Sequence, residues 1–147
     1  MTDVVYRQVQ ALIQGGRHCV MATVNDNRPY CSLMAYVAEP GEAVIYMVTH
    51  RHTRKFRNLT QNPAVSLLID TRGTQRPRAL TLEGTFSEVD DAGKKARVRS
   101  LFLTRHPHMQ SFVDNGDAAF IRIDIDAALY LDGLTDAHHV TFPGKTE

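Results

Sequence analysis

The sequence predicts a mainly β protein, a small β-barrel with flanking helices. Roughly six to eight short apolar runs are separated by turn-forming residues, and only two or three segments show helical periodicity. The chain of 147 residues is long enough to bury a core, and it shows neither a linker nor an internal repeat. We therefore expect residues 1–147 to form one domain, a barrel decorated by helices.

The N-terminal third predicts one helix followed by three strands. Residues 3–14 place apolar side chains at helical spacing, and Gly15 and Gly16 end the pattern. Three apolar runs separated by turn residues come next, which is typical of an antiparallel meander. These runs are residues 18–24, 30–38 and 43–48. The third run lacks alternating polar residues, so we expect burial on both of its faces.

The rest of the chain mixes helices and strands. A helix over 52–62 ends before Pro63, because proline disfavours helical geometry in the residue that precedes it. Another helix begins at Asp90–Asp91 and runs to about Arg105. Apolar or alternating segments predict the remaining strands. These are residues 64–70, 78–89, 118–126, 128–133 and 137–142.

The composition argues against several kinds of partner. The formal net charge is only +1, from 17 Lys plus Arg against 16 Asp plus Glu, and the chain has no Trp, so nucleic-acid binding is not expected. No apolar stretch is long enough to cross a membrane and no signal peptide is visible, which predicts a cytoplasmic protein without a membrane partner. Cys19 and Cys31 are expected to be free, buried thiols. No metal site is predicted, because His50 and His52 lack accompanying Cys or carboxylate ligands.

Residues 49–58, THRHTRKFRN, concentrate positive charge. Arg54, Lys55 and Arg57 fall in the first turn of the second predicted helix, where the helix dipole favours acidic side chains instead. No Asp or Glu occurs from 43 to 69 to neutralise them. Such a departure from a local rule is typical of a functional site.

The groups gathered in this turn are those that bind a phosphate. Free backbone N–H groups, the Thr53 hydroxyl and cationic side chains converge where a buried strand ends at Thr49. We therefore hypothesise a local receptor for a phosphate dianion. The alternative interpretation is a solvated surface turn whose charges keep the protein soluble.

The order of these features, from Pro29 to Gly84, resembles the pyridoxamine 5'-phosphate oxidase-like proteins. The strand that ends in Thr49 is followed, after three residues, by Thr53-Arg54-Lys55 and then by the segments NLTQNPAVSLLI and RALTLEG. The resemblance implies an FMN-binding split β-barrel, which usually forms a homodimer with flavin at the subunit interface. Weaker similarity continues to His139 and is closest to a branch that includes haem-utilisation proteins.

The resemblance also implies roles for the residues that match. Thr49, Thr53, Arg54 and Lys55 would hold the FMN phosphate, and His52 would line the same pocket. A stretch of the second strand would present its backbone and small side chains to the isoalloxazine ring. That stretch is Ser32, Leu33 and Met34. No catalytic residue is identified.

Departures from the family pattern narrow the implied activity. Ala79 stands where the oxidases that make pyridoxal phosphate commonly carry Gln, and their substrate-binding Arg-x-x-Pro segment does not occur in this sequence, so pyridoxamine phosphate oxidation is not expected. Residues 133–135 read Gly-Leu-Thr where the haem-linked branch usually has Gly-Phe-Gly. His138 and His139 could supply a haem ligand or an acid–base group, but neighbouring strand positions face opposite ways, so only one can enter a given pocket. Ordinary surface histidines are the alternative.

Three functions are consistent with these observations. The first is a homodimeric FMN-binding flavoprotein, a flavin-dependent oxidoreductase acting on an undetermined small molecule. The second is a non-catalytic flavin or haem-binding protein that uses the same pocket. The third is an interaction module whose basic turn faces an acidic partner. A deazaflavin in place of FMN remains open, as do the electron donor and acceptor.

Overall fold

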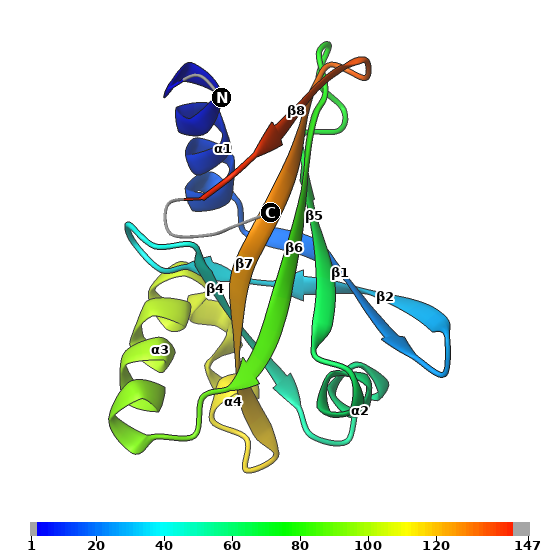
Figure 1. Ribbon diagram of the computed structural model, residues 1–147. Helices are drawn as coiled ribbons and strands as arrows, with labels where there is room; N and C mark the ends of the chain where they lie inside the picture. Colours follow the sequence, from blue (N-terminus) through cyan, green and yellow to red (C-terminus); the bar gives the residue numbers. More distant parts are fainter. Residues whose placement is uncertain (1–2, 143–147) are drawn as a thin grey trace.

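The computed structural model describes residues 3–142, which form one curled antiparallel sheet flanked by helices (Figure 1). The strands are β1 (His18–Asn25), β2 (Arg28–Ala35), β3 (Val37–Ala38), β4 (Val44–His50), β5 (Ala64–Asp70), β6 (Arg78–Glu88), β7 (Ala118–Asp132) and β8 (Asp136–Val140). The helices are α1 (Asp3–Gly15), α2 (Arg54–Gln61), α3 (Ala92–Arg105), the 3-10 turn η1 (Pro107–Met109) and α4 (Gln110–Val113). The predicted mainly β architecture is confirmed.

The strand order is β2-β1-β5-β6-β7-β4-β3, with β8 paired to β7. The expected meander holds for the β1–β2 hairpin but is wrong for β4, which pairs with β7 and with the short β3. Both edges of β4 are therefore occupied, and β2 keeps one edge that no described strand covers. Figure 1 shows α2 at one end of the curled sheet, and α3 with α4 beside β4 and β7.

A single strand, β7, replaces two predicted ones. The sequence predicted two separate strands here, residues 118–126 and 128–133. The structure instead places a β-bulge at this point, where Glu83 pairs with Ala127 and Gly84 with Ile125, leaving Asp126 as the extra residue. The first half of β7 pairs with β4 and the second half with β8. The bulge thus lets one strand serve two partners.

Burial on both faces of β4 is confirmed, since every residue from Val44 to Thr49 is buried. Ile45 and Met47 point into the barrel core, which also takes in apolar side chains of α1. Val44, Tyr46 and Val48 point the other way, into a second cluster beneath α3 and α4. The missing polar alternation in the sequence therefore reflects a strand between two apolar layers.

The cysteines differ from one another. Cys19 is buried on the inner face of β1, and burial raises the pKa of its thiol to about 12. Cys31 is exposed on β2, so the expectation that both thiols would be buried is wrong for this residue. The outer face of this edge strand has no helix over it, which explains the exposure of an otherwise apolar position. Within residues 3–142, no helix has the length and hydropathy needed to cross a membrane.

His106, just after α3, predicts a pH dependence of stability. Its ring is 1% exposed, and its Nε2 lies 2.7 Å from the Tyr36 carbonyl oxygen, to which it donates. Burial lowers the pKa of His106 below its usual 6.5 despite this hydrogen bond. The unfolded chain therefore takes up a proton more readily than the native state, and the free energy of unfolding should fall as pH drops from 6.5 toward the lowered pKa. Urea unfolding between pH 8 and pH 5 should show this decline, and His106→Asn should flatten it.

Candidate functional site

The N-terminus of α2 is built from two threonines at the end of β4. Thr53 caps the helix: its hydroxyl donates to the His50 carbonyl at 2.8 Å and accepts from the Phe56 N–H at 3.4 Å. The buried Thr49 places its Oγ1 3.4 Å from Thr53 Oγ1. The helix predicted here is confirmed, and its first turn begins where the buried strand stops.

Arg54 and Lys55 are the first two residues of α2, so their backbone N–H groups have no preceding helical carbonyl to bind. No acidic residue lies in this first turn. The Arg54 guanidinium lies 4.7 Å from the centre of the Tyr30 ring. Neither Arg54 nor Lys55 forms an ion pair with any carboxylate of residues 3–142. The end of β4 and the start of α2 thus supply two hydroxyls, two N–H groups and two cations without a carboxylate partner among residues 3–142. These four residues are here called the cradle (Thr49, Thr53, Arg54 and Lys55).

Other basic residues of the same segment are turned away to other partners. Arg51 forms a two-point ion pair with Glu88, which raises the Arg51 pKa, and its N–H donates to the Asp117 carbonyl at 2.9 Å. His52 lies 3.6 Å from the Asp117 carboxylate and is largely exposed. His50 stacks on Phe112 with ring centres 4.1 Å apart. The basic cluster of the sequence is therefore divided: Arg54 and Lys55 remain uncompensated, whereas Arg51 anchors the turn.

Sequence reasoning missed Glu88 as the partner of Arg51. The two residues are 37 positions apart, and no local spacing connects them. Only the pairing of β6 with β7, and of β7 with β4, brings the end of β6 beside the turn that follows β4. The acidic partner that the local sequence lacks is thus Glu88 of β6, which strand pairing brings beside the turn.

The predicted ring-contacting residues lie on β2, the edge strand. Ser32 and Met34 turn inward, opposite Met21 and Cys19 of β1, whereas Leu33 turns outward and is 75% exposed. Asp26 and Asn27 both have positive φ, as a two-residue hairpin turn requires. Hydrogen-bonded pairs alternate along such a hairpin, so the register leaves the backbone N–H and C=O of Leu33 directed toward the open edge.

The cradle and β2 are joined through α2. The Arg54 contact with Tyr30 brings the first turn of the helix to β2, two residues from Ser32. The buried Asn58 side chain donates to Thr23 Oγ1 on β1 at 3.0 Å, which fixes the helix against the same hairpin. The Ser32 hydroxyl oxygen is itself buried and has no hydrogen-bond partner among residues 3–142. The structure thus gathers the four cradle residues and sets β2 beside them, with His52 on the exposed side of the turn.

His138 and His139 face opposite sides of β8, as adjacent strand positions should. His138 lies opposite Tyr130, with its Nε2 3.3 Å from the Asp136 carboxylate. His139 lies opposite Leu129 on the outer face of the sheet and lines a hollow of about 520 Å³ there. No group of three or more metal-ligating side chains converges among residues 3–142.

Comparison with known proteins shows which proteins this chain is similar to. A family model described as pyridoxamine 5'-phosphate oxidase matches residues 6–132. None of the curated proteins compared with the chain matches it. Campylobacter jejuni ChuZ is similar in structure, with a TM-score of 0.83 and 12% identity over 100% of this chain and 68% of that chain.

Two further structures are similar at low identity. A FAD-binding protein from Mesorhizobium loti has a TM-score of 0.73 and 20% identity, covering 85% of this chain and 90% of that chain. A heme binding protein from Mycobacterium smegmatis has a TM-score of 0.77 and 16% identity, covering 90% of this chain and 56% of that chain. These likenesses establish the fold and confirm the predicted split β-barrel. Together with the family match over most of its length, they show that the chain belongs to the pyridoxamine 5'-phosphate oxidase family.

Proposed function

We propose that the protein binds FMN and acts as a flavin-dependent oxidoreductase on a small molecule. The observation that supports this most is the cradle: Arg54 and Lys55 stand at a helix N-terminus, and no carboxylate of the described part of the chain pairs with them. A phosphate dianion supplies the missing negative charge and accepts hydrogen bonds from the free N–H groups. The donor set of the cradle therefore fits the phosphate of FMN, in agreement with the family match.

The cradle residues and Leu33 would each contribute to holding the cofactor. Thr49 would donate a hydroxyl hydrogen bond to the phosphate, Thr53 would hold the turn through its bond to the His50 carbonyl, and Arg54 and Lys55 would add charge-assisted hydrogen bonds. The backbone of Leu33, at the open edge of β2, would meet the polar rim of the flavin ring. The bound flavin would supply the redox chemistry, and the protein would position it and control access to it.

We also propose that the protein is a homodimer through the outer face of the sheet. A row of cross-strand neighbours runs over this face without a helix above it. The row is Leu33, Val20, Leu68, Thr81, Leu129 and His139. It is largely apolar, and its first member is 75% exposed. A second copy covering this face would also cover a flavin lying against β2.

Identification of the molecule that co-purifies with the protein tests this proposal. We expect a yellow preparation that absorbs near ~450 nm, the flavin band, and that releases FMN rather than FAD on denaturation. Bleaching by NADH or NADPH, followed by reoxidation by an acceptor, would support the oxidoreductase over a flavin carrier. A colourless protein that does not take up added FMN would contradict the proposal.

Haem binding is the second candidate, and the position of His139 favours it. This imidazole stands on the uncovered outer face beside a hollow, whereas His138 is engaged with Asp136. If haem binds there, its Soret band should shift on adding the protein, and His139→Ala should abolish the shift while His138→Ala retains it. Equal spectra for wild type and His139→Ala would remove this candidate.

The Arg51–Glu88 ion pair should position the cradle without touching the cofactor. We expect Glu88→Gln to weaken FMN binding by about two- to fivefold, because partly exposed pairs contribute up to about 1 kcal/mol. Fluorescence titration of FMN measures the change. Asp114→Asn is the matched control, since it breaks an ion pair of similar exposure, with Arg99, outside the cradle. The same loss in both variants would rule out a positioning role.

A further inference from the structure

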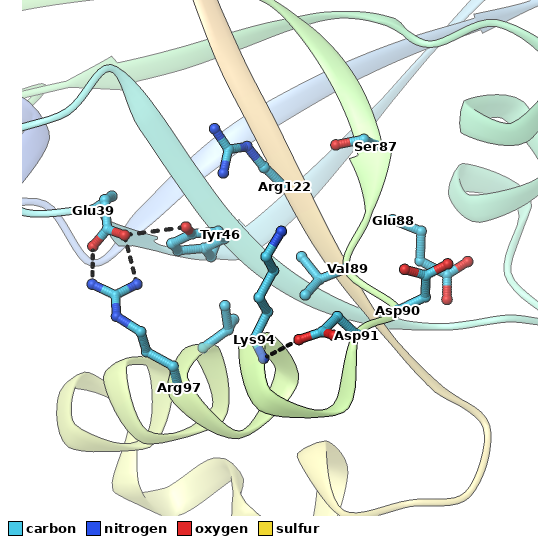
Figure 2. Close-up of a pocket in the computed structure, with 11 residues that line it drawn as sticks. Glu39, Tyr46, Ser87, Glu88, Val89, Asp90, Asp91, Lys94, Arg97 and Arg122 are labelled. Atoms are coloured by element: carbon cyan, nitrogen blue, oxygen red, sulfur yellow. Dashed lines mark hydrogen bonds and ion pairs between the residues drawn. The ribbon is translucent and has the colours of Figure 1, made fainter.

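A pocket of about 500 Å³ lies between α3 and the outer face of the sheet, and none of the cradle residues lines it (Figure 2). Its floor is a row of cross-strand neighbours, Tyr46 on β4, Arg122 on β7 and Ser87 on β6. Lys94 and Val98 of α3 form part of its wall. The volume falls within the range of small-molecule sites, and neither the flavin proposal nor the dimer proposal assigns this pocket a use.

The one buried carboxylate in the pocket is already neutralised. Glu39 accepts from Arg97 Nη1 and Nη2 at 2.5 and 2.6 Å and from the Tyr46 hydroxyl at 3.3 Å. Arg97, as the main cause, holds the pKa of Glu39 below its usual value, so this carboxyl is ionised at neutral pH. The Glu39–Arg97 pair thus builds a rigid wall with no net charge.

Three further groups of the lining are hydrogen-bond donors. Within residues 3–142, neither the Lys94 ammonium nor the Ser87 hydroxyl has a hydrogen-bond or ion-pair partner. Arg122 binds Asp124 through Nε at 3.2 Å and Nη2 at 3.0 Å, which leaves its Nη1 without a partner there. Three unused donors, two of them cationic, therefore line one cavity.

Figure 2 shows how these groups are arranged. The Lys94 side chain extends from α3 toward the strands and ends between Tyr46 and Val89, below Arg122 and Ser87 in this view. Of the other acidic residues of the lining, Glu88 and Asp90 lie on the far side of Val89 from Lys94, and the Asp91 carboxylate accepts from the Lys94 backbone N–H at 2.9 Å. The Lys94 ammonium therefore lies on the strand side of the pocket, near Arg122 and away from the Asp91 carboxylate at the start of α3. Val89, Val98 and the Tyr46 ring add apolar surface to the same lining.

We propose that this pocket binds a small organic anion. Its carboxylate or phosphate group would lie between Lys94 and Arg122, within reach of the Ser87 hydroxyl, where charge-assisted hydrogen bonds are strongest. Its apolar part would pack on Val89 and Val98. The proposal does not depend on FMN, because no residue of this pocket belongs to the cradle.

A calorimetric titration of the protein with phenyl phosphate tests the site. We expect saturable binding to the wild type that weakens at least about tenfold in Lys94→Met, since a charge-assisted contact is lost. Lys95→Met is the matched control, because Lys95 is the next residue of the same helix and points to Phe120. Its affinity should equal that of the wild type. Lys94 is exposed, so Lys94→Met should keep the thermal midpoint of the wild type.

Two further measurements test whether the anion binds in this pocket rather than in the cradle. Benzyl alcohol, which has the ring without the anion, should bind at least about tenfold more weakly than phenyl phosphate. The double variant Arg54→Ala plus Lys55→Ala should keep phenyl phosphate binding. Loss of binding in that variant together with full affinity in Lys94→Met would assign the anion to the cradle and overturn the proposal. Equal affinity for benzyl alcohol, or no saturable binding at all, would overturn it as well.

Discussion

The double substitution Arg54→Ala plus Lys55→Ala is expected to weaken FMN binding by about 3–6 kcal/mol, which corresponds to a hundredfold to ten-thousandfold rise in Kd. Each side chain should contribute one charge-assisted hydrogen bond to the phosphate, worth about 1.5–3 kcal/mol. The loss should be large because neither cation has a carboxylate partner among the described residues to compete for it. Fluorescence titration of apoprotein with FMN measures it.

Two comparisons make that result specific. Arg57→Ala removes a charge from the same turn, but this side chain donates to the His52 carbonyl at 3.3 Å and is not in the cradle, so its FMN affinity should change little. Riboflavin, which lacks the phosphate, should bind the wild type and the double variant equally. Unchanged FMN occupancy in the double variant would refute the assignment of the phosphate to α2.

The sequence predicted most elements because their signals are local. Turn residues, helical spacing and the unbroken apolar run of β4 each reflect a few neighbouring positions, and each corresponds to an observed element. The two errors of strand assignment concern non-local pairing. Periodicity cannot show that β4 pairs with β7 rather than β2. The change of side-chain facing at the Asp126 bulge looks like a boundary between two strands unless the partner strand is known. The short helices η1 and α4 are also too brief for a periodic pattern to reveal.

The candidate site likewise has a part that the local sequence predicts and a part that depends on non-local pairing. The cradle could be predicted because Thr49, Thr53, Arg54 and Lys55 lie within seven consecutive positions, and a strand end followed by a helix N-terminus places them together. The engagement of Arg51 with Glu88 could not, because it requires the register of β6 on β7. The donor-lined pocket beneath α3 was invisible for the same reason. Its floor comes from three strands, and Lys94 reads in the sequence as part of an exposed helical face.

Gly84 lies on β6 opposite the bulge of β7, where the two strands pack closely. A Cβ added at this buried glycine would lie 2.6 Å from Ile123 Cγ2 and 2.8 Å from the Asp124 carbonyl oxygen. Its φ is not positive, so the close approach of β7, rather than backbone freedom, requires glycine here. The carbonyl belongs to a strand held by β6 on one side and β4 on the other, and it cannot move without disturbing both ladders.

We therefore expect Gly84→Ala to lower the free energy of unfolding by about 2–3 kcal/mol, the upper part of the usual cost of overpacking. Urea unfolding followed by circular dichroism gives the value. Gly116→Ala is the matched control, because a Cβ there meets no atom within 4 Å and the backbone φ is not positive. Its stability should stay within about 0.5 kcal/mol of the wild type. An unchanged urea midpoint for Gly84→Ala would mean that β7 can shift at the bulge. This strand, which pairs with both β4 and β8, would then be less rigid than its hydrogen-bonded pairing implies.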